Sequence, residues 1–299
     1  MAENSGYEKY SFGEHYLQNV YVHIPPSPAP ADTGYWVVYI HGGAWRDPDI
    51  LAPSFKATQD HLLSDPSVSY KIAGIASIDY RLSAHPNHPQ DPTSLDAREY
   101  RNAKHPDHIH DVRDGLALLQ SMYGFGERYV LAGHSCGGTM AFQVVMNRVL
   151  SAAEVVRPVA VVSVAGVTNL LGLVEEKAHI SAYREFVTGA FGDEAEGTWE
   201  VVSPAVDGEG VGGVVDSWNN GRVVVMGFSV NDEALPGSQL GFMKGTVDAW
   251  AAAGGDAGVE RRVRIVEDMA ETHDGMWING KEVADVIAIG IRELENMQV

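Results

Sequence analysis

The chain has 299 residues, of which 45% are hydrophobic and 20% are charged, so we expect a folded globular protein rather than a disordered one. Its 40 acidic and 21 basic side chains give a formal net charge of −19, which argues against binding to nucleic-acid phosphates or to an anionic membrane surface. The single cysteine excludes an internal disulfide and a metal site built from several thiolates.

The ends of the chain carry no recognisable targeting signal. Residues 1–16 lack the basic and apolar segments of a secretory signal peptide, and the last residues carry no lipidation motif. No run approaches the roughly 18 consecutive apolar residues of a transmembrane helix. We therefore expect a cytoplasmic protein without a membrane partner.

Short apolar runs that are rich in β-branched residues recur along the chain, and each ends in glycine or polar residues. Runs of this kind are typical of strands buried in a parallel sheet. They lie at residues 35–40, 71–80, 128–133, 159–166, 222–227 and 261–266. An earlier run at residues 16–24 is expected to be an antiparallel strand at the edge of the sheet.

Segments with a helical spacing of apolar residues alternate with these runs. They lie at residues 107–123, 137–150, 238–253 and 281–297. The alternation predicts an α/β fold with a doubly wound, mostly parallel sheet. Because we find no repeat and no linker, we expect a single domain over residues 1–299.

Two stretches interrupt the alternation. Residues 83–104 are rich in proline, histidine and aspartate and are predicted to form a long loop. Residues 168–216 mix acidic, glycine and aromatic residues and are predicted to be a small helical cap inserted into the domain. Within the cap, the glycine-rich residues 207–213 are predicted to be a surface loop.

The strongest chemical signal is a G-x-S-x-G pattern, Gly133-His134-Ser135-Cys136-Gly137. It lies between a predicted strand and a predicted helix, which is the context of a nucleophile elbow, where a sharp turn holds a serine in strained geometry. A chance match is the alternative in a chain with 32 glycines. The strand–turn–helix context favours Ser135 as a nucleophile.

A second signal, His41-Gly42-Gly43-Ala44-Trp45, directly follows the first buried strand. Glycines at this point allow backbone N–H groups to approach a developing oxyanion. We predict an oxyanion hole from Gly42, Gly43 and Ala44 with the backbone N–H of Cys136. The alternative is a tight turn that uses glycine only for its conformational freedom.

Chain order selects the base and the acid, because in α/β-hydrolases the nucleophile is followed by the acid and then by the histidine. Of twelve histidines, only His179 and His273 follow Ser135. His273 comes shortly after the last predicted strand, whereas His179 lies in the predicted cap, so His273 is the predicted base. Asp232, just beyond a predicted strand, is the predicted acid, and the adjacent Glu233 is its competitor.

Other histidines gather between residues 85 and 110, but their spacing matches no metal-binding motif. We therefore predict neither a metal nor a cofactor, and we expect these histidines to pack in loops and helix ends. The segment Asp79–Ser83 is predicted to anchor a loop rather than to contact a substrate.

Four segments together resemble the fungal kynurenine formamidases, which are arylformamidases of the α/β-hydrolase superfamily. They are HGGAW, DYRLSAHPNHPQDP, KHPDHIHDV and AGHSCGGT, and the resemblance runs from about residue 35 to about residue 280. It implies Ser135 as nucleophile, Asp232 as acid and His273 as base, with the oxyanion motif at His41–Trp45. Ala44 replaces the third glycine of classical lipolytic relatives, and residues 193–213 match no motif of the family.

The resemblance implies hydrolysis of N-formyl-L-kynurenine to L-kynurenine and formate in tryptophan catabolism. The expected partner is this small-molecule substrate, and Trp45 is a candidate for lining the aryl side of its pocket. A carboxylesterase, lactone hydrolase or acyltransferase that acts on a secondary metabolite would keep the same triad. A catalytically inactive binding protein on this fold would normally lack a triad member, and none is missing here.

Overall fold

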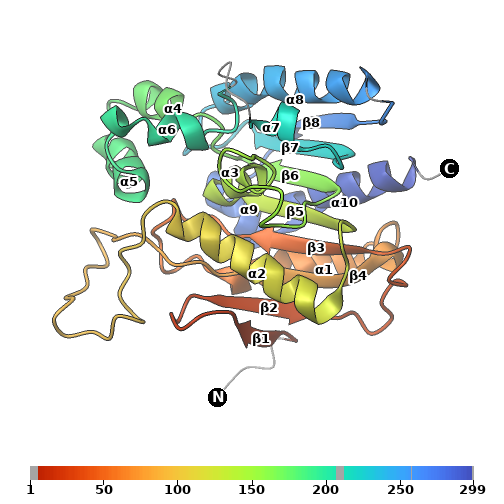
Figure 1. Cartoon of the computed structure of the whole chain (residues 1–299), viewed down its shortest axis with the longest axis horizontal. Helices are drawn as coiled ribbons and strands as arrows, with labels where there is room; N and C mark the ends of the chain where they lie inside the picture. The colour runs from red at the N-terminus through yellow and green to blue at the C-terminus, as the bar shows by residue number, and fades with distance from the viewer. Residues whose placement is uncertain (1–5, 207–211, 257, 298–299) are drawn as a thin grey trace.

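The computed structural model describes residues 6–206, 212–256 and 258–297 (Figure 1). Within them lies an eight-stranded sheet with the strand order β1-β2-β4-β3-β5-β6-β7-β8. The strands are β1 (Glu8–Ser11), β2 (Asn19–His23), β3 (Tyr35–Ile40), β4 (Ile72–Ile78), β5 (Tyr129–His134), β6 (Ala160–Val164), β7 (Val223–Ser229) and β8 (Arg262–Met269). Strands β4, β3, β5, β6, β7 and β8 run parallel to one another. Strand β2 pairs antiparallel with both β1 and β4. The predicted doubly wound α/β fold is therefore confirmed.

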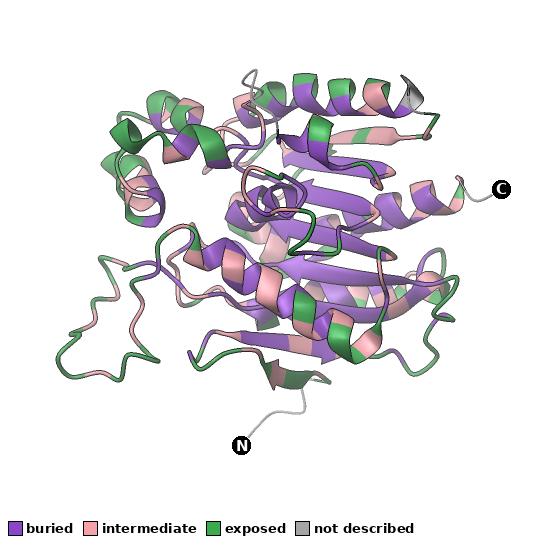
Figure 2. Ribbon diagram, in the orientation of Figure 1, coloured by how far each residue is buried: buried purple, intermediate pink, exposed green. Residues whose placement is uncertain are grey.

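Helices cover both faces of this sheet (Figure 1). One face carries α1 (Lys56–Ser64) and α10 (Lys281–Glu295), with the short α9 (His273–Asn279) beside them. The other face carries α2 (Asp107–Tyr123), α3 (Cys136–Gln143) and α8 (Ser238–Asp256), with α7 (Val214–Ser217) against α8. Strands β3, β5 and β6 are buried along their whole length (Figure 2), as expected for a sheet covered on both sides.

Two sequence-based expectations need correction, and one strand was not predicted. The predicted edge strand β2 is internal, because β1 pairs with its outer side. β1 was missed since its sequence EKYS is short and largely exposed, and therefore carries no apolar signal. Helix α3 ends at Gln143 rather than near residue 150. The apolar pattern continues to Leu150 because the turns that follow Gln143 are also largely buried. Here the pattern indicates burial and not helix.

The segment predicted to be a cap contains three helices before its undescribed part, α4 (Leu170–Glu176), α5 (Ser181–Phe191) and α6 (Thr198–Val202). They lie together beyond the carboxyl ends of the central strands, at the left of Figure 1. Most of the predicted glycine-rich loop, residues 207–211, lies outside the described residues. Residues 83–104 form no helix or strand, as predicted, and project as a long loop below the cap helices (Figure 1).

No helix in the described part of the chain combines the length and the apolar character that a membrane span requires.

Candidate active site

Ser135 lies at the sharp turn between β5 and α3, with φ 54° and ψ −125°, a conformation that costs energy for a residue with a side chain. The two flanking glycines make this turn possible. A Cβ at Gly133 would overlap the backbone of Gly137, and a Cβ at Gly137 would overlap the carbonyl oxygen of Ile40. Because α3 comes this close to the end of β3, the serine is held at the carboxyl edge of the sheet, with 8% of its surface exposed.

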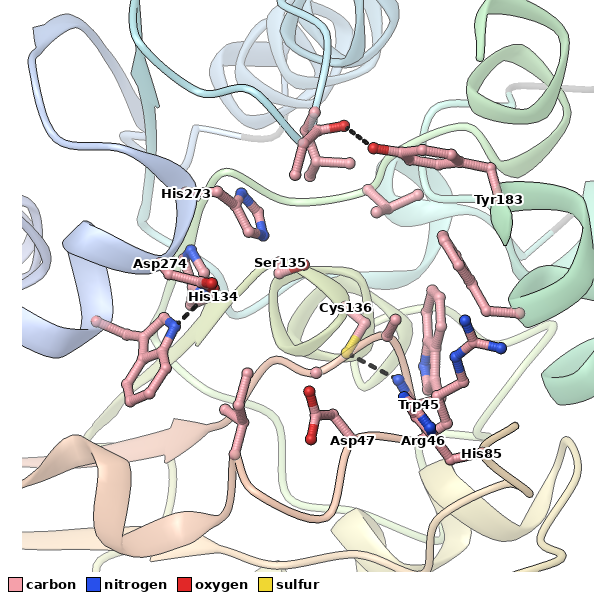
Figure 3. Close-up of a pocket in the computed structure, with 18 residues that line it drawn as sticks. Trp45, Arg46, Asp47, His85, His134, Ser135, Cys136, Tyr183, His273 and Asp274 are labelled. Carbon is pink, nitrogen blue, oxygen red and sulfur yellow. Dashed lines mark hydrogen bonds between the residues drawn. The ribbon is translucent and has the colours of Figure 1, made fainter. Parts of the chain in front are cut away.

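His273 and Asp232 come together at the same edge from loops that follow β8 and β7. His273 Nδ1 lies 2.8 Å from Asp232 Oδ2, and the side chains are 12% and 1% exposed. The other oxygen of Asp232 accepts the N–H groups of Ala234 and Leu235, at 2.9 and 2.8 Å. This carboxylate is therefore fixed by its own loop, and its bond to Nδ1 leaves Nε2 of His273 for the cavity, where Figure 3 shows the ring directed toward Ser135.

Glu233, the competitor for the acid position, has a different contact. Its carboxylate accepts the backbone N–H of His273 at 3.1 Å and does not bond the imidazole. His273 is the first residue of α9, and the Thr272 side chain caps that helix by accepting the N–H of Gly275. Glu233 and the cap thus fix the backbone of His273, while Asp232 fixes its ring.

A second histidine packs against this pair. The rings of His134 and His273 lie 4.6 Å apart between centroids, and His134 is fully enclosed. Burial, and next the neighbouring His273, hold the pKa of His134 well below its usual range. His134 therefore remains neutral and places no positive charge beside His273.

The loop after β3 has three successive residues with positive φ, namely Gly43 at 95°, Ala44 at 49° and Trp45 at 59°. Positive φ is rare for residues with side chains, so this path is strained. In the described ranges 6–206, 212–256 and 258–297, the N–H groups of Gly42 and Gly43 donate to no protein acceptor. Unpaired backbone donors beside a buried serine are unusual, and they are available to an oxygen of a ligand.

Tyr80 and Cys136 support the strained loop through hydrogen bonds of their side chains. The Tyr80 hydroxyl donates to the carbonyl oxygens of His41 and Gly42, at 3.2 and 3.1 Å. The Cys136 sulfur accepts the N–H of Trp45 at 3.3 Å (Figure 3) and lies 3.5 Å from the Tyr80 hydroxyl. Burial raises the pKa of the Cys136 thiol to about 11, against the opposing hydrogen bonds from Tyr80, Trp45 and Ala44. The sulfur is thus a neutral acceptor inside the fold.

These elements enclose one end of a cavity of about 260 Å³ (Figure 3). Four aromatic side chains from three separate parts of the chain contribute to its walls. Tyr183 and Phe186 extend from α5, Trp277 extends from α9, and Trp45 lies beneath the loop with only 1% of its surface exposed. The Tyr183 hydroxyl donates to the carbonyl oxygen of Ala234 at 2.6 Å, which joins α5 to the loop that carries Asp232.

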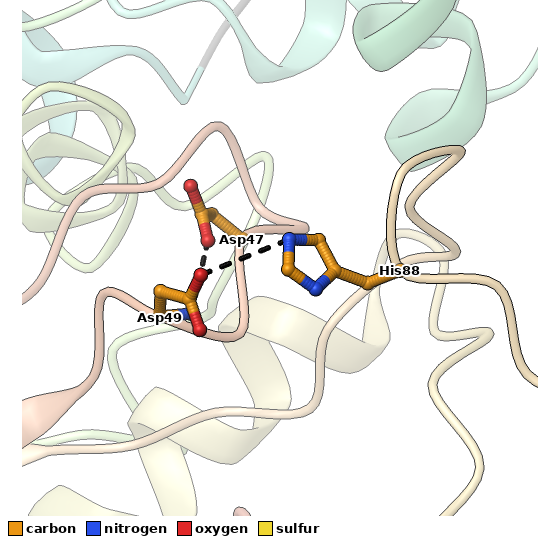
Figure 4. Close-up of side chains that lie close together, drawn as sticks. All are labelled: Asp47, Asp49 and His88. Carbon is orange, nitrogen blue, oxygen red and sulfur yellow. Dashed lines mark hydrogen bonds and ion pairs between the residues drawn. The ribbon is translucent and has the colours of Figure 1, made fainter.

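One group of side chains in the described part of the chain has the spacing of a possible cation site. Ligand atoms of Asp47, Asp49 and His88 lie within 4.8 Å of one another (Figure 4), and Asp47 also lines the cavity. The Asp49 and His88 side chains are 78% and 39% exposed, and His88 Nε2 lies 3.7 Å from the Asp49 carboxylate. Exposed acidic groups of this kind are common without a metal, and we assign no metal to this group.

The structure brings the sequence-predicted residues Ser135, Asp232, His273, Gly42 and Gly43 to one edge of the sheet. Ala44 is also in the loop, but its N–H interacts with the Cys136 thiol. Sequence reasoning assigned Cys136 only its backbone N–H and missed the contact of its sulfur with the loop. It also missed the lining residues Arg46, Tyr183, Phe186 and Trp277, because no local motif marks them.

No protein-family model matches the chain, whereas individual relatives do. Over 289 residues it is 34% identical to a kynurenine formamidase-like hydrolase from Fusarium equiseti, covering 94% of this chain and 92% of that protein. The chain belongs to the kynurenine formamidase-like hydrolases. A kynurenine formamidase from Aspergillus versicolor is 33% identical over 259 residues, which cover 81% of this chain and 84% of the relative.

Solved structures that resemble this formamidase-like hydrolase are esterases. The native Est2 esterase of the planctomycete Thermogutta terrifontis aligns with a TM-score of 0.61 at 17% identity, covering 97% of this chain and 92% of that one. An esterase from Pyrobaculum calidifontis aligns with a TM-score of 0.58 at 17% identity, covering 93% and 81%. At such low identity the likeness establishes the α/β-hydrolase fold alone.

Proposed function

We propose that this hydrolase cleaves the formamide of N-formyl-L-kynurenine, releasing L-kynurenine and formate, by means of a Ser135–His273–Asp232 triad. The observation that carries the proposal is the Asp232–His273 pair directed at a serine on a strained strand-to-helix turn (Figure 3). The formamidase relatives support the choice of substrate. We place the reaction in tryptophan catabolism in the cytoplasm, without a cofactor.

Each member of the triad has a distinct role in this proposal. Ser135 Oγ attacks the formyl carbon while His273 Nε2 takes its proton, and the C=O electron pair moves to the oxygen. Asp232 holds the imidazole in the tautomer that leaves Nε2 free, and it stabilises the imidazolium without taking the proton. Its own two backbone hydrogen bonds keep it oriented throughout.

The tetrahedral intermediate then collapses toward a formyl-enzyme. His273 gives its proton to the aryl nitrogen, the C–N bond breaks, and kynurenine leaves. Water next attacks the formyl ester with His273 as general base, and Ser135 recovers its proton as formate is released. The unpaired N–H groups of Gly42 and Gly43, with the N–H of Cys136, are the proposed donors to the oxyanion in both steps.

The strain in the loop fixes the direction of its N–H groups. This matters because a donor helps catalysis only if it already points at the developing charge. Removing one donor from a preorganised oxyanion hole costs about 2.7–4 kcal/mol of transition-state stabilisation. Tyr80 and the Cys136 sulfur keep the loop in its costly conformation before substrate arrives. The aromatic side chains Tyr183, Phe186 and Trp277 then offer faces for the aryl ring of the substrate.

The proposed function is tested by comparing kcat/KM for N-formyl-L-kynurenine with that for longer-chain p-nitrophenyl esters. A formyl group is the smallest acyl group, so extra methylenes should not fit beside Ser135. We expect formyl-kynurenine to exceed these esters by at least ~100-fold, which corresponds to ~2.7 kcal/mol of discrimination. Turnover of an ester, thioester or lactone without turnover of formyl-kynurenine would refute the formamidase assignment and leave a serine hydrolase with another acyl substrate.

A further inference from the structure

Arg46 is distinctive among the side chains that line the catalytic cavity. Within residues 6–206, 212–256 and 258–297, it is the one lysine or arginine there, beside the acidic Asp47 and Asp274. Burial, and next the charge of Arg46, lower the pKa of the neighbouring His85, so His85 adds little positive charge. Arg46 directly follows the oxyanion loop, and Figure 3 shows it across the cavity from His273.

The guanidinium of Arg46 is already arranged to bind a carboxylate. Its Nη1 atom lies 2.6 Å from Glu185 Oε1, and the guanidinium lies over the Phe186 ring at 5.7 Å from the ring centre. The Arg46 side chain is 13% exposed, whereas that of Glu185 is 53% exposed. An ion pair with one solvated partner contributes little stability, so a second carboxylate can replace Glu185 at small cost. The planar fork of arginine suits such a replacement.

Asp47 supplies the opposite charge at the adjacent position. Its Oδ1 atom accepts the N–H of Asp49 at 2.9 Å, and its Oδ2 atom has no hydrogen-bond partner among the residues described. Asp47 therefore has one carboxylate oxygen available for a cation at the same end of the cavity. A positive and a negative side chain next to each other match the two charges of an α-amino-acid group.

We propose that Arg46 and Asp47 form a subsite for the α-amino-acid group of the substrate, with Arg46 binding its carboxylate in place of Glu185 and Asp47 binding its ammonium. This proposal rests on the proposed function, since N-formyl-L-kynurenine carries the amino-acid group at the end of the acyl chain that is ortho to its reactive formamide. Glu185 then acts as an internal competitor that occupies the guanidinium when no substrate is bound. Selectivity for an amino acid thus comes from side chains outside the triad.

The test compares two substrates that share the same formamide. N-formyl-L-kynurenine carries the amino-acid group, and 2-formamidoacetophenone is a neutral aryl ketone without it. The readout is the ratio of their kcat/KM values, in which any general damage to the oxyanion loop cancels. We expect this ratio to fall about 10- to 100-fold in Arg46→Gln, chiefly through KM for formyl-kynurenine, because a hydrogen bond to a charged group is lost. Asp47→Asn should lower it in the same direction, and Arg46→Lys should restore part of it.

Two further variants sharpen the result. Glu185→Gln removes the competitor and should raise the ratio about 2- to 5-fold, the range of an exposed ion pair. Arg184→Gln is the matched control. Arg184 directly precedes Glu185 on α5, but it pairs with Glu194 and does not line the cavity. Its ratio should equal that of the wild type.

The outcomes separate the two proposals. An unchanged ratio in Arg46→Gln, while the wild type hydrolyses both formamides, overturns the subsite and leaves the proposed function intact. A lower ratio in Glu185→Gln contradicts the role of Glu185 as a competitor. If the wild type hydrolyses neither formamide, the proposed function fails and the subsite fails with it.

Discussion

The floor of the cavity, which comprises Ser135, Asp232 and the loop 41–45, differs from its rim, which comprises Arg46, Asp47, His85 and the α5 side chains. Ser135, His41, Gly42 and Trp45 of the floor are buried, and the floor is held by backbone geometry and by hydrogen bonds to fixed groups. The rim is partly solvated, and its Arg46–Glu185 contact joins a loop to helix α5. Acyl-transfer chemistry needs the fixed arrangement, whereas the choice of substrate can change at the rim without disturbing it.

The largest expected effect concerns the nucleophile on the floor. Ser135→Ala should lower kcat by roughly 10⁴-fold or more, because the members of a triad act as a unit. The variant should remain folded, since alanine removes only a hydroxyl that has no hydrogen-bond partner among the described residues. Steady-state kinetics with formyl-kynurenine and a thermal melt would check both points. Near-normal turnover by Ser135→Ala would show that Ser135 is not the nucleophile.

The next effect distinguishes two adjacent carboxylates. Asp232→Asn should lower kcat by about 10³- to 10⁴-fold, because an amide disfavours the required imidazole tautomer. Glu233→Gln is the matched control and should cost little, because a glutamine oxygen can still accept the N–H of His273. Reversed results would identify Glu233 as the acid, against the 2.8 Å contact of Asp232.

Two separate glycine-to-alanine variants compare how tightly the floor and helix α5 are packed. Gly137→Ala should destabilise the fold by several kcal/mol, since its Cβ would overlap the carbonyl oxygen of Ile40 and force the elbow apart. Gly189→Ala on α5 meets no atom within 4 Å and should stabilise the protein by about 0.5–1 kcal/mol through helix propensity. Denaturant unfolding of both variants measures the difference, and equal effects would contradict the contrast in packing.

The smallest expected effect on kcat concerns the support of the loop. Tyr80→Phe removes the hydroxyl that bonds the carbonyl oxygens of His41 and Gly42. We expect kcat to fall about 10-fold with KM nearly unchanged, because weaker preorganisation costs about 1.4 kcal/mol at the transition state only. A rise in KM with an unchanged kcat would instead show that Tyr80 supports substrate binding.

Much of the fold and the floor could be predicted from sequence because their signals are local. The strand 35–40 and the helix 107–123 agree with β3 and α2 residue for residue, since each has an uninterrupted pattern and clear boundaries. The elbow and the oxyanion loop are short motifs whose glycines are required by close backbone contacts. Chain order favoured His273 as the base and Asp232 as the acid, with Glu233 as competitor, and the structure brings Asp232 into contact with the His273 ring.

The rim could not be predicted, because it is formed by residues that are distant in sequence and carry no motif. Arg46 meets Glu185 only when helix α5 packs against the loop after β3. His88 approaches Asp49 through the long loop 83–104, whose composition predicts irregular structure but no position. The role of the Cys136 sulfur was also hidden, since sequence indicates a residue beside the nucleophile but not the direction of its side chain.

The central claim, that the floor acts through a serine nucleophile, is tested most directly by covalent labelling. The wild type is treated with a serine-directed organophosphonate, and the modified peptide is identified by mass spectrometry while the loss of formamidase activity is followed. The account predicts a single modification on Ser135 that increases in step with inactivation, and none on Ser135→Ala. Modification of a different residue in step with inactivation, or full activity with Ser135 modified, would contradict it.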